Sequence, residues 1–340
     1  MKHQNVLQLQ GHPRSKDNFM NLHKLPFTPK FAIRRNDLQT KEILNVSSWA
    51  DMENRKYPKR KVLVSNFLHD REAVMLYSPT GVGKTWLSLA IAMIAAGRGK
   101  MELLDWVNEE PQPVCYVDGE MLEEDIHERV KLLIPSLNVD EDELRKNFLY
   151  VSRVSQPDSV EEFLSLELDE NQIELLRWVK SNTETGKHPI VVLDNLSNLV
   201  ELGDDNSAGQ MQNFNMMVTK ARKIGCSMVI VHHTGKNLKF GPDGVPTWRG
   251  SYDMATRLDK TMCLLPCQSS LDGYVTFQVL EGKSRRGQRI SLSIQFNPFD
   301  RKWELFDESS TEDRHQLVME LLERGYVAKY EDLKDKIVRS

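Results

Sequence analysis

The sequence predicts an α/β protein with a mostly parallel central sheet, and three observations support this. Short apolar runs, such as residues 72–77, 113–118 and 189–194, have the length and composition of buried strands. Polar or charged residues stand where these runs end. Stretches with helical periodicity separate the runs, as expected when crossover helices join parallel strands.

The composition is that of a globular protein. The chain has 340 residues, of which 40% are hydrophobic, so it can bury a sizeable core. No apolar run approaches the length of a membrane span, and the first residues lack the apolar core of a signal peptide, so we expect a cytoplasmic protein with no membrane partner. The four cysteines form no C-x-x-C pair, and we expect them to be reduced and buried.

The charge is unevenly distributed along the chain. Residues 1–61 contain 13 Lys/Arg and 5 Asp/Glu, a net charge of +8, so the remainder carries −12 of the total of −4. We expect a basic arm or linker over 1–61, with one helix near 38–49, a folded core over 62–307 and a helical tail over 308–340. The arm could contact nucleic acid phosphates, cover an acidic neighbouring subunit or be a solvated leader.

A phosphate-binding loop is the clearest motif. Residues 76–85 are expected to run from a buried strand through a tight loop into a helix that ends near Ala96. Gly83, Lys84 and Thr85 complete the pattern G-x-x-x-x-G-K-[ST], in which backbone N–H groups and the lysine bind phosphates and the hydroxyl binds Mg²⁺. Ser78 stands where the pattern has its first glycine. The predicted nucleotide-binding residues of this loop are Ser78, Thr80, Gly81, Val82, Gly83, Lys84 and Thr85.

Two carboxylates follow the next buried strands. Glu120 comes just after the strand 113–118 and is our candidate general base for activating water, although it could instead cap the helix that follows. A further strand is expected at 148–152 and a helix at 171–181. Asp194 ends the strand 189–194 as in a Walker B motif, where it would hold Mg²⁺ together with Thr85, unless it only starts a turn.

The remaining candidates are His232 and His233 and two basic segments. His232 and His233 end the strand that begins near Cys226 and could sense the γ-phosphate. The long loop 234–250 carries Lys236, Lys239 and Arg249, which would suit contact with a nucleic acid backbone. A helix is expected over 251–259, then strands at 261–266, 274–280, 290–295 and 303–306. Residues 283–286 form a basic run that could be only an exposed hairpin tip.

The order of these motifs resembles that of hexameric replicative helicases of the DnaB and plasmid RepA type, including the AAA_25 group. The matching segments are residues 78–85, 116–121, 191–195, 230–236, 249–259 and 281–287. The resemblance implies a RecA-like P-loop core with terminal antiparallel strands, and it supports Glu120 as the base. It favours His232 over His233 as the γ-phosphate contact. It further implies that Lys283 and Arg285 reach the nucleotide of a neighbouring subunit, and that the loop 234–250 faces DNA in a central channel.

These expectations combine into a leading functional hypothesis. It is an ATP- and Mg²⁺-dependent motor that forms a homo-oligomeric ring, hexameric if it follows the related family, and moves on single-stranded DNA as a replicative helicase of a plasmid, phage or integrated element. Two alternatives remain open. One is a nucleotide-dependent oligomeric switch or scaffold in regulation or antiphage defence, and the other is a recombination mediator of the RecA/RadA kind.

Overall fold

The computed structural model describes residues 46–155, 165–200, 208–235, 240–241, 245–248, 254–267, 273–285 and 290–306. The chain divides into two units, Met1–Pro58 and Lys59–Ser340. In the first unit the described residues form helix α1, Trp49–Asn54. The helix begins only at Trp49 because the Ser48 side chain caps it and Asp51 completes a capping box. Residues 46–48 of the helix expected at 38–49 are therefore not helical, whereas residues 38–45 and the tail 308–340 lie outside the described residues.

The second unit contains a nine-stranded sheet that confirms the expected α/β class. Its strand order is β13-β12-β11-β10-β3-β9-β8-β6-β7. The strands are β3 Ala73–Ser78, β6 Val114–Asp118, β7 Phe148–Ser152, β8 Ile190–Asp194, β9 Ser227–His233, β10 Lys260–Pro266, β11 Val275–Ser284, β12 Ser291–Asn297 and β13 Lys302–Leu305. Two small hairpins lie outside this sheet and pair β1 Val62–Val64 with β2 Leu68–His69, and β4 Lys100–Met101 with β5 Trp106–Val107.

The sheet changes direction at β10. Strands β10, β3, β9, β8, β6 and β7 are parallel neighbours, whereas β11, β12 and β13 continue from β10 as antiparallel strands. The carboxyl ends of the parallel strands therefore share one edge of the sheet, which we call the carboxyl edge. The end of β11 lies at the opposite edge, the amino edge, because Ser284 pairs with Lys260 at the start of β10.

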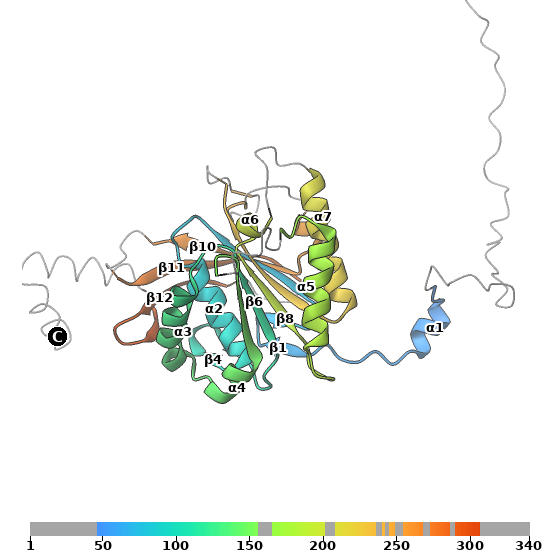
Figure 1. Ribbon diagram of the computed structural model, residues 1–340, viewed down its shortest axis with the longest axis horizontal. Helices are drawn as coiled ribbons and strands as arrows, with labels where there is room; N and C mark the ends of the chain where they lie inside the picture. The colour runs from blue at the N-terminus through green and yellow to red at the C-terminus, as the bar shows by residue number, and fades with distance from the viewer. Residues whose placement is uncertain are drawn as a thin grey trace, which may run out of the picture. The chain divides into compact units, whose positions relative to one another are not determined.

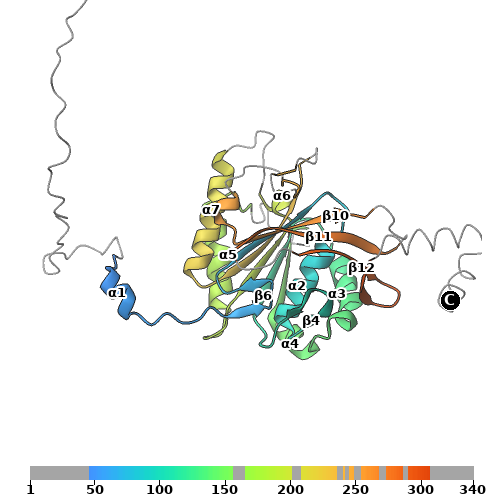
Figure 2. The same cartoon turned by 180° about the vertical axis from the view of Figure 1, so that it is seen from behind.

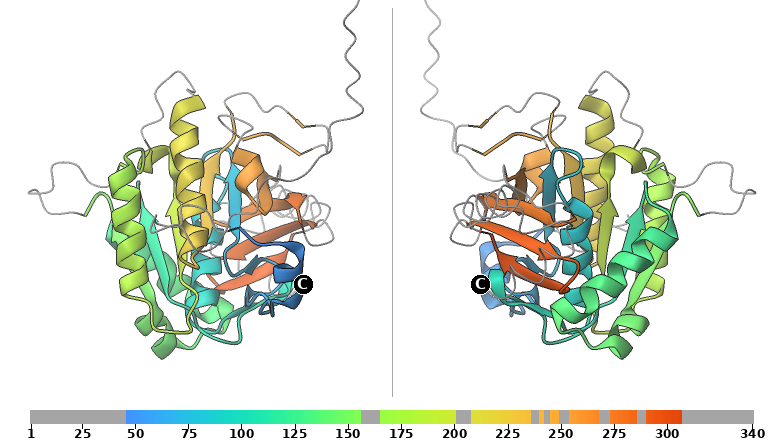
Figure 3. Two further views of the ribbon diagram at one scale, coloured as in Figure 1. Left: turned by 90° about the vertical axis from the view of Figure 1, so that its right-hand side faces the viewer. Right: turned by 90° about the vertical axis from the view of Figure 1, so that its left-hand side faces the viewer.

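Helices cover both faces of the sheet (Figures 1 and 2). The helices α2, α3 and α4 lie on one face, and α5 and α7 lie on the other, with the sheet between them (Figure 3). The helices are α2 Lys84–Ala96, α3 Glu123–Leu137, α4 Glu141–Asn147, α5 Asp169–Ser181, α6 Leu196–Leu199, α7 Ala208–Lys223, α8 Met254–Arg257 and the 3-10 helix η1 Glu102–Leu104.

Side-chain alternation along the strands divides the apolar core in two. On β3, Val74 and Leu76 pack with helix α2, while Met75 and Tyr77 pack with the cluster around α5 and α7. Burial on both faces explains why the central strands are almost continuously apolar in sequence. Three of the cysteines are buried and Cys267 is partly exposed. In the described part of the chain, no helix has the length and apolar character needed to cross a membrane.

Candidate functional site

The loop between β3 and α2 is shaped by two glycines. Gly81 and Gly83 have φ values of +81° and +119°, which L-residues with side chains rarely adopt. A Cβ atom on Gly83 would also lie 2.6 Å from Val275 and 2.9 Å from Phe277. Gly83 is the N-cap of α2, so the loop directs the positive end of the helix dipole toward any phosphate bound there.

Ser78 ends β3 below this loop and does not need the freedom of a glycine. Its backbone does not have a positive φ, since it is absent from the positive-φ residues of the described chain. The Ser78 hydroxyl donates to the carbonyl oxygen of Pro79 at 2.6 Å and accepts from the Lys84 ammonium at 3.1 Å. Serine at this position therefore helps to orient Lys84. This contact gives a structural reason for a serine where the usual pattern has a glycine.

Lys84 is buried at the start of α2. Its Nζ atom donates to the carbonyl oxygens of Ser78 at 3.3 Å and Pro79 at 2.9 Å. Burial lowers its pKa to about 8, although the negative charges of Asp194 and Glu120 act in the opposite direction. These oxygens and the Ser78 hydroxyl carry no charge, so the ammonium is suited to receive an anion in the loop.

Asp194 lies at the end of β8 in a cluster of hydroxyl groups. Its Oδ2 atom accepts hydrogen bonds from Tyr116 Oη at 2.6 Å and Ser88 Oγ at 3.2 Å. Thr85 also hydrogen-bonds to this carboxylate. Burial raises the pKa of Asp194, which these hydroxyls partly oppose. Tyr116 begins one of the segments that resemble the helicase family, but the sequence assigned no role to it or to Ser88.

Glu120 lies next to Asp194 because β6 and β8 are adjacent strands. Its Oε2 atom accepts from Asn195 Nδ2 at 2.8 Å and from Asn198 Nδ2 at 3.3 Å. The side chain is exposed and outside the helix, since α3 begins at Glu123. These contacts hold the carboxylate beside the loop, which favours the general-base interpretation over a helix cap.

Asp118 was not among the residues selected from the sequence. Its Oδ1 atom accepts from the backbone N–H groups of Glu120 at 2.7 Å and Met121 at 2.6 Å. These bonds fix the turn that carries Glu120. Burial raises the pKa of Asp118 to about 6, and the nearby charges of Asp194 and Glu120 act in the same direction.

A cavity of about 740 Å³ brings the candidate residues together at the carboxyl edge. Its lining includes Thr80, Gly81, Val82, Gly83, Lys84, Thr85, Glu120 and Asp194. Hydroxyl and carboxylate oxygens of Thr85 and Asp194 are the donor type that Mg²⁺ prefers. The described residues contain no cluster of three or more His, Cys, Asp or Glu suited to a metal ion.

The structure brings His233, and not His232, to this cavity. His232 and His233 point to opposite faces of the sheet because they are consecutive on β9. His233 lines the cavity beside the loop, whereas His232 is 0% exposed and its Nδ1 atom lies 3.4 Å from Ser197 Oγ. The expected preference for His232 therefore disagrees with the geometry.

Lys283 and Arg285 lie away from the cavity, at the amino edge. Register along β10 aligns Lys260 both with Ser284 and with Val74 at the start of β3. The loop follows Ser78, four residues further along β3 and hence roughly 13 Å away along the strand. Neither cation is therefore brought to the cavity of its own chain.

Lys236, Lys239 and Arg249 lie outside the described residues. The described residues of the segment 234–250 form two antiparallel bridges, Thr234 with Trp248 and Phe240 with Pro246. Tyr77 at the end of β3 anchors this segment, since its Oη donates to the carbonyl oxygen of Pro246 at 2.8 Å and its ring meets Trp248 edge-on. Phe240 is 61% exposed, an aromatic residue that sequence analysis did not single out.

We expect nucleotide affinity to depend on pH through Lys84. Phosphates bind the ammonium form, so above pH 8 binding must be accompanied by uptake of a proton, because the pKa of Lys84 is about 8. The dissociation constant of a fluorescent ATP analogue should rise above pH 8, by up to about tenfold per pH unit. Below pH 7, Lys84 should cause no change in this constant with pH.

The control for this titration is Lys84→Met, in which binding should be weaker and the slope above pH 8 lost. An equal slope in Lys84→Met would contradict the assignment.

The effect of Lys84 on the stability of the fold should have the opposite sign to its effect on nucleotide affinity as the pH rises. The unfolded chain binds more protons than the folded chain between pH 8 and 10.5, so this lysine's contribution to the free energy of unfolding rises with pH over that range.

Comparison with known proteins places these features in a family. Residues 39–238, more than half of the chain, match the AAA_25 family model, described as an AAA domain. No match was found among curated proteins.

Two solved structures are similar to this chain. One is a KaiC-like protein from the hyperthermophilic archaeon Pyrococcus horikoshii OT3 (14% identity over 72% of this chain and 94% of that chain, TM-score 0.46). The other is a DnaB-like replicative helicase, from a study of its interactions with primase (16% identity over 70% of this chain and 58% of that chain, TM-score 0.50). This chain thus spans about 58% of the DnaB-like helicase chain. The likeness to the helicase agrees with the expected RecA-like core. By its family match, the chain belongs to the AAA_25 family of AAA domains and is a P-loop ATPase.

Proposed function

We propose that this ATPase is a ring-forming motor that acts on single-stranded DNA, and specifically a replicative helicase of a plasmid, phage or integrated element. The observation that carries the proposal is the separation of Lys283 and Arg285 from the cavity that holds Lys84, Thr85, Glu120 and Asp194. Cations at the amino edge can serve catalysis if a second subunit presents its nucleotide to them. Hydrolysis then depends on assembly, as in a motor whose subunits act on one another.

The chemistry assigned to each residue follows from its position. Backbone N–H groups of the loop and Lys84 bind the phosphates, while Thr85 and Asp194 would hold Mg²⁺, which would supply positive charge to neutralise the phosphates. Glu120 accepts a proton from the water that attacks the γ-phosphorus as the bond to the ADP oxygen breaks. His233, which lines the cavity, donates a hydrogen bond to the γ-phosphate. The neighbour's Lys283 and Arg285 stabilise the charge that develops during transfer.

DNA contact is assigned to the segment 234–250. It follows β9 directly and is anchored to the end of the strand that enters the phosphate-binding loop, so the two can move together. Lys236, Lys239 and Arg249 supply positive charge and Phe240 supplies an exposed ring, the combination with which proteins bind single strands. The fold likeness to a DnaB-like replicative helicase is consistent with this role.

We expect Phe240→Ala to weaken binding to single-stranded DNA. Stacking of one base contributes about 1–3 kcal/mol, so the dissociation constant should rise about 5- to 150-fold. Fluorescence anisotropy of a labelled oligonucleotide, with a non-hydrolysable ATP analogue present, measures this change. Phe299→Ala is the matched control, since Phe299 is also exposed but lies in the turn between β12 and β13. Equal affinities for both variants would argue against a stacking role.

The proposal as a whole is tested by measuring ATP turnover against the concentration of single-stranded DNA, together with the mass of the assembly. A motor should form a closed ring with ATP, hydrolyse ATP faster when DNA is added, and separate strands. Turnover no faster than that of Lys84→Ala would contradict the proposal. ATP-dependent assembly without DNA stimulation or strand separation would instead support a switch or scaffold, and filaments in electron micrographs would support a recombination mediator.

A further inference from the structure

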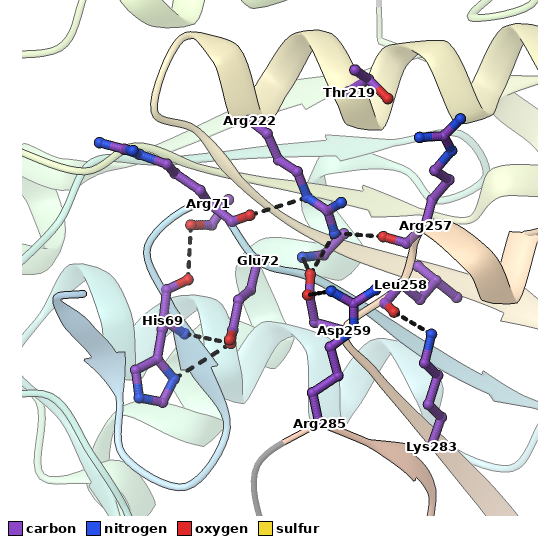
Figure 4. A network of polar contacts seen from close by, with 12 residues as sticks. His69, Arg71, Glu72, Thr219, Arg222, Arg257, Leu258, Asp259, Lys283 and Arg285 are labelled. Atoms are coloured by element: carbon purple, nitrogen blue, oxygen red, sulfur yellow. Dashed lines mark hydrogen bonds and ion pairs between the residues drawn. The ribbon is translucent and has the colours of Figure 1, made fainter. Parts of the chain in front are cut away.

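A buried carboxylate lies at the amino edge and is surrounded by basic side chains (Figure 4). It belongs to Asp259, which precedes β10 and is 5% exposed. Three cationic side chains gather around it, those of Arg222, Lys283 and Arg285, and we call these four residues the Asp259 cluster. The cluster lies outside the nucleotide cavity, and no family motif identified in the sequence assigns a role to Asp259.

Asp259 is joined twice to the strand that leads into the phosphate-binding loop. Its backbone N–H donates to the carbonyl oxygen of Ala73 at 2.8 Å. Its Oδ2 atom accepts from the backbone N–H of Ala73 at 3.0 Å. Since Ala73 is the first residue of β3, the carboxylate is fixed relative to the strand that ends at Ser78.

Asp259 is also joined twice to Arg285. The Oδ1 atom pairs with Arg285 Nη1 at 3.0 Å, and the Asp259 carbonyl oxygen accepts from the Arg285 backbone N–H at 3.2 Å. Lys283 donates to the carbonyl oxygen of the preceding residue, Leu258, at 2.7 Å. The Arg285 side chain is 49% exposed, so part of its guanidinium remains open to a partner while Asp259 holds it.

Arg222 fixes the carboxylate from the other side. Its Nη2 atom pairs with Asp259 Oδ2 at 2.5 Å, and the same guanidinium donates to the carbonyl oxygens of Arg71 at 3.2 Å and Arg257 at 2.5 Å. Arg222 lies in the last turn of α7, the helix that leads into β9. One negative charge therefore separates three positive ones, which would repel each other without it. Burial lowers the pKa of Lys283, as does the charge of Arg285, whereas Asp259 raises it.

We propose that Asp259 is a positioning residue that holds Arg285 and Lys283 in the orientation needed to reach a neighbouring subunit's nucleotide, and that ties this orientation to β3 of its own subunit. This rests on the proposed function, in which Lys283 and Arg285 act on a neighbour. It adds a physical link through which the two nucleotide sites that flank one subunit can influence each other.

Asp259→Asn tests the proposal because it preserves shape and an oxygen acceptor for Ala73 but removes the charge that pairs with Arg285. The homomeric Asp259→Asn protein should form an assembly of the same mass as wild type and bind nucleotide with the same affinity, but its kcat should fall at least tenfold. Mixed with Lys84→Ala subunits, which have an intact Arg285 and a defective phosphate loop, it should regain activity above the sum of the two separate proteins. A general structural defect would not be rescued in this way.

Two further variants make the test decisive. Asp70→Asn is the matched control, because Asp70 is also 5% exposed near this edge but pairs with Arg71 at 3.5 Å, and its kcat should stay within twofold of wild type. If Asp259→Asn does not assemble, Asp259→Glu carries the same test, since it keeps the charge but displaces it. Its kcat should also fall and be rescued by Lys84→Ala.

The outcomes separate this inference from the proposed function. Arg285→Ala mixed with Lys84→Ala tests action between subunits alone. If that pair is rescued but neither Asp259 variant is impaired, or their loss is not rescued, the role of Asp259 is wrong and the proposed function stands. If Arg285→Ala is not rescued, the premise fails and the inference falls with it.

Discussion

Glu120→Gln should lower kcat for ATP hydrolysis by about 10²- to 10⁴-fold while leaving nucleotide affinity within about threefold of wild type. The substitution keeps the size of the side chain and an oxygen to accept from Asn195 Nδ2, which lies 2.8 Å from Oε2. It removes the base that takes a proton from water. Steady-state turnover and titration of a fluorescent ATP analogue measure the two quantities separately.

Glu123→Gln is the matched control for this prediction. Glu123 is an exposed carboxylate in the first turn of α3, where it interacts with the helix dipole. If negative charge near this helix were all that mattered, both variants would lose a similar and small amount of activity. Wild-type kcat in Glu120→Gln would show that another group activates the water.

Arg285→Ala should lower kcat by about 10³- to 10⁵-fold, the range observed when an arginine finger is removed from a phosphoryl-transfer site. Lys283→Ala should also lower kcat, because both cations would face the same transition state. Neither change should weaken nucleotide binding to isolated subunits, because both residues lie at the edge opposite the phosphate-binding loop. Turnover at protein concentrations above and below assembly, with nucleotide affinity in parallel, tests this.

Lys302→Ala provides the comparison, since Lys302 is an exposed cation on β13 of the same antiparallel segment. Its kcat should match that of wild type. An Arg285→Ala protein that hydrolyses ATP normally in the assembled state would mean that residues 283–286 are only a basic surface, the alternative left open by the sequence.

Much of the core was predictable because buried parallel strands have a distinctive sequence. The strands at Asp118 and Asp194 end at the residues expected, since continuous apolar runs have few alternative structures in a protein of this size. Residues 251–253 of the helix expected over 251–259 lie outside the described residues, and the helix ends at Arg257 because Asp259 bonds with Ala73 instead. Bonds between distant segments of this kind leave no periodic signal.

The same limitation explains what the sequence could not decide at the site. The preference between His232 and His233 depends on which face of the sheet carries α2, and a two-residue period alone does not specify this. Asp118 accepts a hydrogen bond from the backbone N–H of Glu120, and Tyr116 donates one to Asp194 on the adjacent strand. Neither contact can be read from the sequence. Ser78 could be understood only when its hydroxyl was found beside Lys84.

The claim that one nucleotide site is built by two subunits is tested most directly by mixing Lys84→Ala with Arg285→Ala. Each variant should be nearly inactive alone, because the first lacks a phosphate-binding lysine and the second lacks the cation offered to its neighbour. In mixed assemblies, an Arg285→Ala subunit that binds ATP beside a Lys84→Ala subunit meets an intact Arg285. The account predicts ATP turnover well above the sum of the separate proteins, whereas turnover equal to that sum would contradict it.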